Sequence, residues 1–583
     1  MPADFAAYDA QPWKAAYGTA IASELPAPRY RNLAALVHSA CSRYATKKAY
    51  TAVVPNGMNG SLTYRQVGEL SDAFAVYLRE VCDLQPGDRV AVQLPNGLAY
   101  PVVAFGVLKA GCVLVNTNPL YTASEMAHQF KDAGARVLVI VDMFVDKLPE
   151  VLPQTGIERV VLAGVSEMFP AIPNLIVRGV QKVWSRVLPP VPALGRPVER
   201  LAQALRAGAA AARPGQVQAW AEAIAPDDLA ALQYTGGTTG VSKGAMLTHA
   251  NLLANIDQVL AMGKSHMGPD ECVLTALPLY HIFAFTANLL CFFDIGGRNI
   301  LIPSPRPVQN LQRAIENYPI TWITGVNTLF NGLMNEEWFT AFPPKHLKAA
   351  IAGGTALHRA VAARWELTTG TRIAEGYGLT ECSPVVSFNP LSGEARPDSI
   401  GVPVPGTEVR LVDDAGAPVP AGEPGELIVR GPQVMRGYWQ RAAETAQVLK
   451  DGWLYTGDVA VMEADGYFRV VDRKKDMVLV SGFNVYPNEV EDALATMDAV
   501  LEAAVVGIPD ATTGEAVRAY IVRNPEVAGE LTREAVIAHC RTCLTDYKIP
   551  KSIVFRDELP KTPVGKILRK DLKVEVKAEF SKP

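Results

Sequence analysis

Glycines, hydroxyl side chains and one lysine are concentrated between Tyr234 and Gly244, in the order Tyr-Thr-Gly-Gly-Thr-Thr-Gly-Val-Ser-Lys-Gly. Glycine lets backbone N–H groups turn inward, and such a concave group of donors suits an oligophosphate. The lysine would add a positive charge on the phosphates. The composition favours a polyphosphate site over a glycine-rich surface turn. The candidate binding residues are Tyr234, Thr235, Gly236, Gly237, Thr238, Thr239, Gly240 and Lys243.

The elements expected around this loop differ from those of a Walker A loop. A Walker A lysine is followed by Ser or Thr and by a helix, whereas Lys243 is followed by Gly244 and a short apolar segment, 245–247. An apolar run at 229–233 predicts a buried strand before the loop. A helix is expected only after Thr248, which would be its N-cap. The sequence therefore predicts a strand–loop–strand phosphate clamp.

Further polar residues are embedded in apolar or glycine-rich segments along the chain. By itself, His281 in the segment 277–285 would more often be a buried core histidine than a functional group. A lysine near the C-terminus, such as Lys566, is usually solvated. The segments 352–356, 375–381, 452–458 and 472–476 carry Gly353, Gly354, Tyr377, Gly378, Thr380, Glu381, Asp458, Arg473 and Lys475.

Together, and in this order from Leu62 to Lys566, these segments resemble the motifs of the adenylate-forming enzymes, which include acyl-CoA synthetases, luciferases and the adenylation domains of peptide synthetases. The resemblance implies that Gly353 and Gly354 pack against adenine and that Tyr377 stacks on it, followed by Gly378. Thr380 would bond the α-phosphate, while Glu381 and Thr235 would hold Mg²⁺, a cation that prefers hard oxygen ligands. Asp458 and Arg473 would hold the ribose. Lys566 would bridge the acyl carboxylate and the α-phosphate.

The resemblance is strongest to bacterial long-chain fatty acid–CoA ligases, through 278–330 and 451–487. It implies ATP, Mg²⁺ and coenzyme A as cofactors or co-substrates and a fatty acid as substrate. His281 would orient the carboxylate, Phe285 would gate the acyl tunnel, and Val326 would form its wall. Lys475 would be the hinge for a rotating C-terminal lid, and Gly482 would border the thiol channel. A medium-chain or aryl acid ligase is the alternative within the family, and a non-catalytic acyl-binding protein is the alternative outside it.

The length of the chain and its pattern of apolar and polar residues predict the domain organisation around these motifs. A chain of 583 residues is too long for one core, so at least two domains are expected. Alternating strand and helix patterns from Asp88 to Leu162 predict a doubly wound α/β sheet. Short strands between turns predict a β subdomain at 398–471. The expected division is 1–471 for the adenylation domain, 472–476 for the hinge and 477–583 for a small α+β lid.

Charge and cysteine content limit the partners and the location. A net charge of −4 gives no indication of a basic surface that would bind nucleic acid. Cys540 and Cys543 form an isolated C-x-x-C, which on a helix is more often packing than zinc, so a reduced, cytoplasmic chain is expected. The longest apolar run, at 282–293, is shorter than the roughly twenty residues of a spanning helix. The oligomeric state is left open, although relatives are often homodimers.

Residues 174–188 predict an amphipathic helix with apolar residues every fourth position and Arg178, Lys182 and Arg186 at the same spacing. With Trp184, that composition suits peripheral contact with the inner membrane surface. A helix that packs on the body and leaves its basic side in water is an equally good interpretation.

Overall fold

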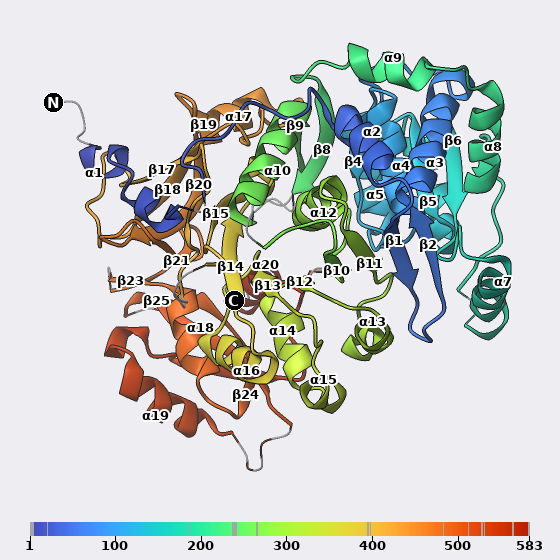
Figure 1. The fold of residues 1–583 in the computed structure, drawn as a ribbon. Helices are drawn as coiled ribbons and strands as arrows, with labels where there is room; N and C mark the ends of the chain where they lie inside the picture. The colour runs from blue at the N-terminus through green and yellow to red at the C-terminus, as the bar shows by residue number, and fades with distance from the viewer. Residues whose placement is uncertain are drawn as a thin grey trace.

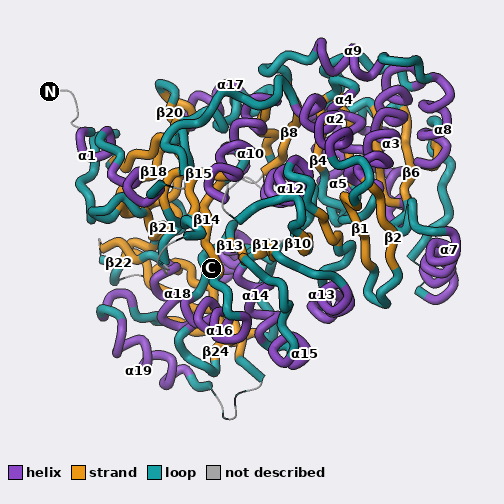
Figure 2. Tube along the Cα trace, viewed as in Figure 1, coloured by secondary structure: helices purple, strands orange, loops and turns teal. Residues whose placement is uncertain are grey.

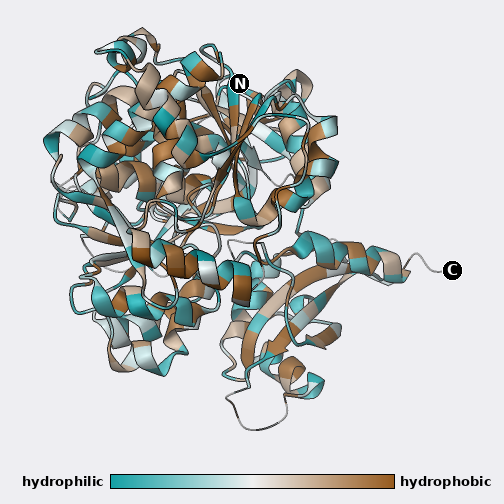
Figure 3. Cartoon of the chain, turned by 90° about the vertical axis from the view of Figure 1, so that its right-hand side faces the viewer, coloured by the Kyte–Doolittle hydropathy of each residue, from teal (hydrophilic) through white to brown (hydrophobic). Residues whose placement is uncertain are grey.

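The computed structural model describes residues 5–19, 21–185, 187–235, 242–263, 266–392, 396, 398–481, 483–510, 512–525, 527, 529, 531–562 and 565–580. Two large sheets form a body, a small β subdomain lies at one end of it, and the C-terminal residues form a separate lobe beneath (Figure 1). Helices flank the strands of the body on their faces (Figure 2). Apolar strands run through the interior, while the outer helices alternate polar and apolar faces (Figure 3).

One large sheet has seven strands in the order β7-β6-β5-β3-β4-β8-β9. Their bounds are Arg89–Gln93 for β3, Val113–Asn116 for β4, Val137–Val141 for β5, Arg159–Ala163 for β6, Val198–Arg200 for β7, Leu229–Thr235 for β8 and Lys243–Thr248 for β9. All neighbours pair in parallel except β8 and β9. The predicted α/β alternation is confirmed, as is the antiparallel strand pair on either side of the phosphate loop.

The other large sheet has nine strands in the order β16-β15-β14-β13-β12-β10-β11-β1-β2. Their bounds are Lys48–Val53 for β1, Asn59–Thr63 for β2, Cys272–Thr275 for β10, Arg298–Leu301 for β11, Trp322–Gly325 for β12, Ala349–Ala352 for β13, Ile373–Gly378 for β14, Val385–Phe388 for β15 and Val402–Pro403 for β16. Its central strands β14 to β1 are parallel. Their carboxyl ends therefore lie along one edge, where ligands bind in open α/β sheets.

Helices of the body begin and end at recognisable signals. Thr63 and Thr122 are N-caps that form capping boxes with Gln66 and Glu125, and Gly134 ends one of these helices in the left-handed region. The helices are α2 Leu33–Arg43, α3 Tyr64–Val76, α4 Ala99–Lys109, α5 Ala123–Ala133, α6 Leu148–Val151, α8 Leu201–Ala211, α9 Gln216–Ala223, α10 His249–Gly263, α11 Ile282–Ala284, α12 Phe292–Asp294, α13 Gln312–Asn317, α14 Asn327–Met334, α15 Glu337–Ala341 and α16 Arg359–Thr369. The N-cap predicted at Thr248 accepts a hydrogen bond from the Asn251 N–H, 3.1 Å away.

The β subdomain is the predicted antiparallel unit. It comprises β17 Glu408–Val412, β18 Gly425–Arg430, β19 Leu449–Lys450, β20 Trp453–Met462 and β21 Phe468–Arg473, with α17 Ala442–Val448 beside it. The N-terminal segment packs against this unit: Tyr8 donates a hydrogen bond to the Val419 carbonyl, and Trp13 contacts Phe468. The lead-in segment, with α1 Ala6–Asp9, is thus anchored by buried aromatic side chains.

The C-terminal lobe contains a five-stranded sheet, with β22 Val478–Val480, β23 Phe483–Val485, β24 Val500–Asp510, β25 Gly514–Arg523 and β26 Ser552–Arg556. Three helices cover it: α18 Pro487–Ala495, α19 Arg533–Cys543 and α20 Arg569–Phe580. Cys540 is buried in its core, which agrees with the packing interpretation of the C-x-x-C. The expected hinge, 472–476, joins β21 of the β subdomain to β22 of the lobe.

The predicted amphipathic helix is α7, Ala171–Gly179, continued by a π-helical segment, Val180–Trp184, at the outer edge of the body (Figure 1). Its apolar face points to solvent. The exposed fractions of its apolar side chains are 72% for Ile172, 74% for Leu175, 42% for Ile176, 46% for Val180 and 75% for Val183. Arg178 instead turns inward to the buried Asp142, 3.3 Å away. Among the described residues, no helix is long and apolar enough to cross a membrane.

Candidate active site

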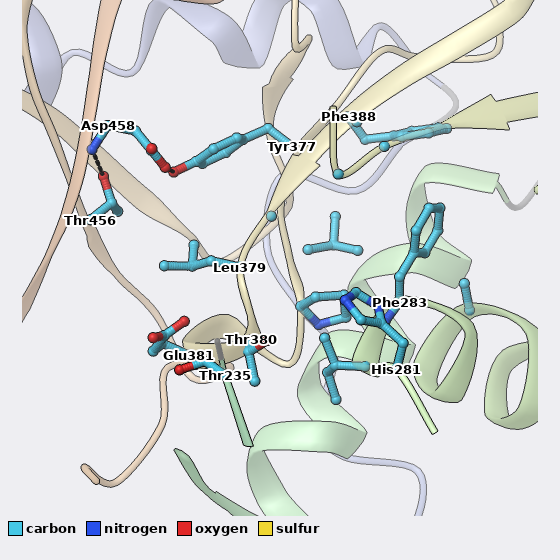
Figure 4. Close-up of a pocket in the computed structure, with 18 of the residues that line it drawn as sticks. Thr235, His281, Phe283, Tyr377, Leu379, Thr380, Glu381, Phe388, Thr456 and Asp458 are labelled. Carbon is cyan, nitrogen blue, oxygen red and sulfur yellow. Dashed lines mark hydrogen bonds between the residues drawn. The ribbon is translucent and has the colours of Figure 1, made fainter. Parts of the chain in front are cut away.

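A cavity of about 720 Å³ lies where the body, the β subdomain and the C-terminal lobe meet. Residues from all three contribute to its wall: Thr235 from β8, Asp458 from β20 and Lys566 from the lobe. In Figure 4, Tyr377 and Asp458 lie at the upper left, His281 and Phe283 lie at the right, and Thr235, Thr380 and Glu381 lie below Tyr377 and Asp458. The sequence motifs are thus brought to one site from segments far apart in the chain.

The side with Asp458 offers a carboxylate to a polar ligand. Asp458 is buried and accepts a hydrogen bond from the Tyr377 hydroxyl at 2.5 Å, and its other oxygen lies 3.2 Å from Nε of Arg473 (Figure 4). The Asp458 N–H donates to the Thr456 hydroxyl, which fixes the backbone. A carboxylate held in this way can accept hydrogen bonds from the two hydroxyls of a cis-diol.

Glu381 and Thr235 face the cavity together, as the sequence predicted for a metal site. Oε1 of Glu381 accepts a hydrogen bond from the Tyr438 hydroxyl at 2.7 Å, so the carboxylate is oriented. With Thr380, the site presents one carboxylate and two hydroxyls. This donor set fits Mg²⁺, which is bound by one or two carboxylates and keeps several waters.

Lys243 also lines the cavity, and its ammonium group lies 2.8 Å from Glu444 in α17 and 5.2 Å from the centre of the Tyr438 ring. The loop residues Gly236, Gly237, Thr238, Thr239 and Gly240, predicted to bind phosphate with it, lie outside the described residues. Tyr234 does not line the cavity. Because side chains alternate along β8, Thr235 faces the cavity while Tyr234 points away and donates to Asp132 at 2.7 Å. Its prediction as a ligand-binding side chain is therefore wrong.

Lys566 reaches the cavity from the lobe. Burial, followed by the positive charge of Arg473, lowers the pKa of Lys566 from 10.5 to about 7. The preceding Gly565 has φ +90° and lies against α14, so that a Cβ there would be 2.6 Å from Oγ1 of Thr328. The loop is therefore seated on the body, and its ammonium group is in a place that an anion would stabilise.

His281 is the N-cap of α11, and its Nδ1 accepts a hydrogen bond from the Phe283 N–H at 3.3 Å. Burial, and then the charge of Lys566, lowers the pKa of His281 to about 4, so the imidazole is neutral at pH 7. A neutral ring beside a lysine can donate or accept a hydrogen bond without repelling the ammonium.

The predicted gate is at the wrong residue. Phe285 is fully buried in the main core and does not line the cavity, whereas Phe283 does. The reason is local: the two residues are two positions apart on a helical segment, so their side chains point to roughly opposite sides. Val326 lines the cavity as predicted.

Glycines make the floor of the cavity accessible to a ligand. Gly353, Gly354 and Gly378 line it, and Gly354 has φ +80°. A Cβ on Gly378 would be 2.2 Å from the Pro384 carbonyl, so only glycine lets β14 approach the turn before β15.

Sequence reasoning missed most of the apolar end of the cavity. The lining there includes Val259, Met262, Met267, Phe292, Trp322, Ile351, Phe388 and Leu391. These residues come from α10, α12, β12, β13 and the segment after β14, and no short motif unites them. Only the alternation of Trp322, Thr324 and Val326 along one strand could have indicated a shared face.

Lys475, the expected hinge residue, lines the cavity beside Arg473, and burial lowers the pKa of its ammonium group. Gly482, expected at the thiol channel, lies outside the described residues.

Comparison with known proteins gives one consistent result. The family model described as AMP-binding enzyme matches residues 37–439, and that of the AMP-binding enzyme C-terminal domain matches 489–566. A long-chain-fatty-acid–CoA ligase of Escherichia coli is 45% identical over 568 residues, which cover 97% of this chain and 98% of that protein. A feruloyl-CoA synthase of an Amycolatopsis species is 34% identical, with 91% of this chain and 97% of that protein covered. A solved anthranilate CoA ligase in complex with anthranoyl-AMP is 27% identical, with a TM-score of 0.82 over 95% of this chain and 99% of that one.

Proposed function

The chain belongs to the AMP-binding enzyme family, and we propose that it is a long-chain fatty acid–CoA ligase that works through an acyl-adenylate. In the first step a carboxylate oxygen attacks the α-phosphorus of ATP and pyrophosphate leaves. In the second the thiol of coenzyme A attacks the adenylate carbonyl, giving the thioester and AMP. The observation that carries this proposal is a single cavity with Lys566, Glu381 and Asp458 at its polar end and an extended apolar end.

The polar end supports specific roles in the first step. Asp458 would accept hydrogen bonds from both ribose hydroxyls, and the ring of Tyr377 would stack on the adenine. Lys566 would neutralise charge that develops on the carboxylate and the α-phosphate, which is the main task of a protein in phosphoryl transfer. Thr380 and Lys243 would bind phosphate oxygens. Neutral His281 would orient the carboxylate, with Phe283 forming the channel wall beside it.

Mg²⁺, held by Glu381 and Thr235, would supply neutralisation of the pyrophosphate leaving group. The Tyr438 hydroxyl would support this metal site, because its hydrogen bond to Glu381 fixes the orientation of the carboxylate. The loop 236–240 would complete the phosphate contacts through its N–H groups.

The second step needs a path for the thiol where the lobe now places Lys566. We propose that the lobe rotates about Lys475, which moves the lysine out and brings the Gly482 segment toward the adenylate. The conformation in the structure supports the adenylation pose, because Lys566 lines the cavity.

The exposed face of α7 supports contact with a membrane. Ile172, Leu175, Ile176, Val180 and Val183 form one apolar stripe, and Lys182 is exposed next to it. An apolar stripe beside positive charge suits an anionic lipid surface, where a fatty acid substrate is concentrated. Val183→Glu should reduce co-sedimentation with vesicles of phosphatidylglycerol and phosphatidylethanolamine, while Lys131→Glu on α5 should not. Equal binding by both variants and the wild type would refute the proposal.

ATP, coenzyme A and the free cysteines fit a cytoplasmic location, with α7 at the inner membrane face. A homodimer is proposed from the resemblance alone, and the molar mass in solution tests it.

The activity itself is tested by acid-dependent pyrophosphate release across acetate, decanoate, palmitate, oleate, benzoate and coumarate. Highest kcat/KM for palmitate or oleate, with thioester formed when coenzyme A is added, is the expected result. A preference for coumarate would establish an aryl acid ligase instead, and the absence of turnover with every acid would establish a non-catalytic protein.

A further inference from the structure

One tryptophan, Trp322, lines the apolar part of the cavity. Side chains on one face of β12 and its continuation, Val326, Thr324 and Trp322, line the cavity in succession. Residues 323 and 325 face the opposite side, and Ile323 belongs to a different core cluster. The parallel strands β10 and β13 flank β12, so this row runs from the carboxyl edge of the sheet toward its amino edge.

The two ends of this row have different surroundings. Val326 is at the reacting end, because a Cβ on Gly565, next to Lys566, would lie 3.4 Å from its Cγ2. Trp322 is at the other end, in a small apolar cluster with Phe292 and Ile351 that is separate from the main core. The rings of Trp322 and Phe292 meet edge to face, with their centres 5.6 Å apart.

The indole of Trp322 is held in place from behind. Its Nε1–H donates to Oε2 of Glu271 at 3.0 Å, and Oε1 of the same carboxylate lies 2.6 Å from the Lys348 ammonium. Trp322 and Glu271 are buried, whereas the Lys348 side chain is half exposed. A large ring anchored by a buried, charge-assisted hydrogen bond cannot swing aside at little cost.

The length of the row can be compared with the length of an acyl chain. Four residues of strand at ~3.3 Å each separate Val326 from Trp322, a distance of about 13 Å. An extended hydrocarbon with bonds of ~1.5 Å advances roughly 1.3 Å per carbon, so about ten carbons fit between them. A longer chain meets the indole and must turn toward Met267 and Leu391, which line the same end.

We propose that Trp322, positioned by Glu271, is a specificity-determining residue that ends the straight part of the acyl channel about ten carbons from the carboxylate. This inference rests on the proposed function. It adds that acids longer than about ten carbons bind bent, with their terminal carbons against Met267 and Leu391. The preference among long acids therefore depends on how well that bend is accommodated.

The test compares kcat/KM for decanoate and hexadecanoate in Trp322→Ala, the wild type and the control Ile323→Val, which changes the opposite face of the same strand. Each further buried methylene is worth roughly fourfold. If Trp322→Ala makes room for two or more further methylenes, the ratio of kcat/KM for hexadecanoate to kcat/KM for decanoate should rise by about tenfold or more. In Ile323→Val that ratio should stay unchanged. An unchanged ratio in folded, active Trp322→Ala overturns the inference. Failure of the proposed function looks different, since the wild type would then release no pyrophosphate with either acid.

A binding measurement removes the dependence on how well the alanine variant folds. Stearic acids with vicinal bromines at carbons 6 and 7, 9 and 10, or 15 and 16 quench tryptophan fluorescence on contact. The difference in quenching between the wild type and Trp322→Phe should be largest for the 9,10-dibromo acid. The same difference at all three positions, with acid binding retained, overturns the inference.

Glu271 is tested as the positioning residue. Glu271→Gln keeps an acceptor for the indole, so it should retain the wild-type chain-length profile. Glu271→Ala leaves the N–H without a partner and should move the profile toward that of Trp322→Ala. Equal profiles for Gln and Ala would show that the hydrogen bond does not position the ring.

Discussion

Lys566→Ala should separate the two half-reactions. In the structure the ammonium group is held in the cavity at a cost: its pKa falls from 10.5 to about 7. At 1.36 kcal/mol per unit, keeping it protonated without ATP costs at most roughly 5 kcal/mol. The phosphates and the carboxylate offset that cost when they bind. Loss of a single oriented neutral donor at a developing charge already costs ~2.7–4 kcal/mol, so adenylation should fall by at least 10²–10³-fold in the alanine variant.

The assay measures each half-reaction by itself. Pyrophosphate release from ATP and palmitate reports the first, and thioester formation from supplied palmitoyl-AMP and coenzyme A reports the second. The second should stay within about threefold of the wild type, because the proposed rotation takes Lys566 out of the site before thiol attack. Lys561→Ala is the matched control, since Lys561 lies in the same segment but pairs with Glu502 at 2.6 Å. Equal losses in both half-reactions would refute the role given to Lys566.

The same lysine predicts a pH dependence with a definite sign. Only the protonated form stabilises developing negative charge, and that form is lost as pH rises through the lowered pKa. With the lobe closed, kcat/KM for adenylation should therefore decline above pH 7. Bound ATP raises the pKa of the lysine, so kcat at saturating ATP should stay level to higher pH. Lys566→Arg, if active, should lack the decline because arginine stays protonated.

Three further changes test other parts of the site. Asp458→Asn should raise KM for ATP by about tenfold or more and leave KM for palmitate unchanged, because a hydrogen bond to a charged group contributes ~1.5–3 kcal/mol. An equal rise in both KM values would contradict a contact between Asp458 and the ribose. Nδ1 of His358 in the body and Oδ1 of Asp492 in the lobe lie within hydrogen-bonding distance at the surface, 3.1 Å apart. His358→Ala should change the ratio of the two half-reaction rates by no more than about fivefold, and the double variant with Asp492→Asn should show the same ratio as His358→Ala alone. Gly378→Ala should lower the melting temperature by several degrees or prevent folding, since its Cβ would meet the Pro384 carbonyl. A melting curve of the variant equal to that of the wild type would refute this close packing.

The parts of the fold that could be predicted are those with strong local periodicity. Strands such as β5, Val137–Val141, are continuous apolar runs, and their bounds were predicted to within a residue or two. The helix before β5, α5, begins with a capping box. The strand pair around the phosphate loop could be predicted in the same way, from a glycine-rich turn between two apolar segments. At the site, Glu381, Asp458 and Lys566 could be predicted because short motifs carry them.

The residues that were misplaced depend on geometry that a motif does not encode. Phe283 and Phe285 lie on nearly opposite sides of one helical segment, and only the packing of that segment on the body decides which of the two faces the cavity. Tyr234 is directed away by the alternation along β8. Trp322 is far along the chain from Lys566, and only packing brings the two residues to one cavity.

The sequence of α7 predicted an amphipathic helix but left open which face meets the protein. In the structure two neighbouring residues face inward: Val177 is buried in the main core, and Arg178 forms an ion pair with Asp142, whose side chain is buried and also 2.6 Å from Arg200. A buried carboxylate needs such partners. With Val177 and Arg178 inward, the apolar stripe is left in solvent.

Charged residues on the two sides of Lys475, the proposed hinge, have different partners. Arg473 is bound to Asp458 of the body, while Asp476 is bound to Lys573 of the lobe at 2.7 Å, and Lys475 between them has no ion pair among the described side chains. Asp472 lies on the body side of Lys475 yet accepts hydrogen bonds from the lobe, from the Asn488 N–H at 2.7 Å and from Arg569 at 3.2 Å.

Rotation about Lys475 would have to break those two contacts of Asp472. Arg569 would keep its ion pair with Glu491 inside the lobe, 2.6 Å away, so its guanidinium would not be left buried and unpaired. Asp472 would in turn exchange a buried position, which raises its pKa, for one that water can reach. The two contacts of Asp472 that the proposed rotation would break are thus polar and replaceable by water. Their replacement by water would keep the two proposed poses close in free energy, as the use of both in each turnover would require.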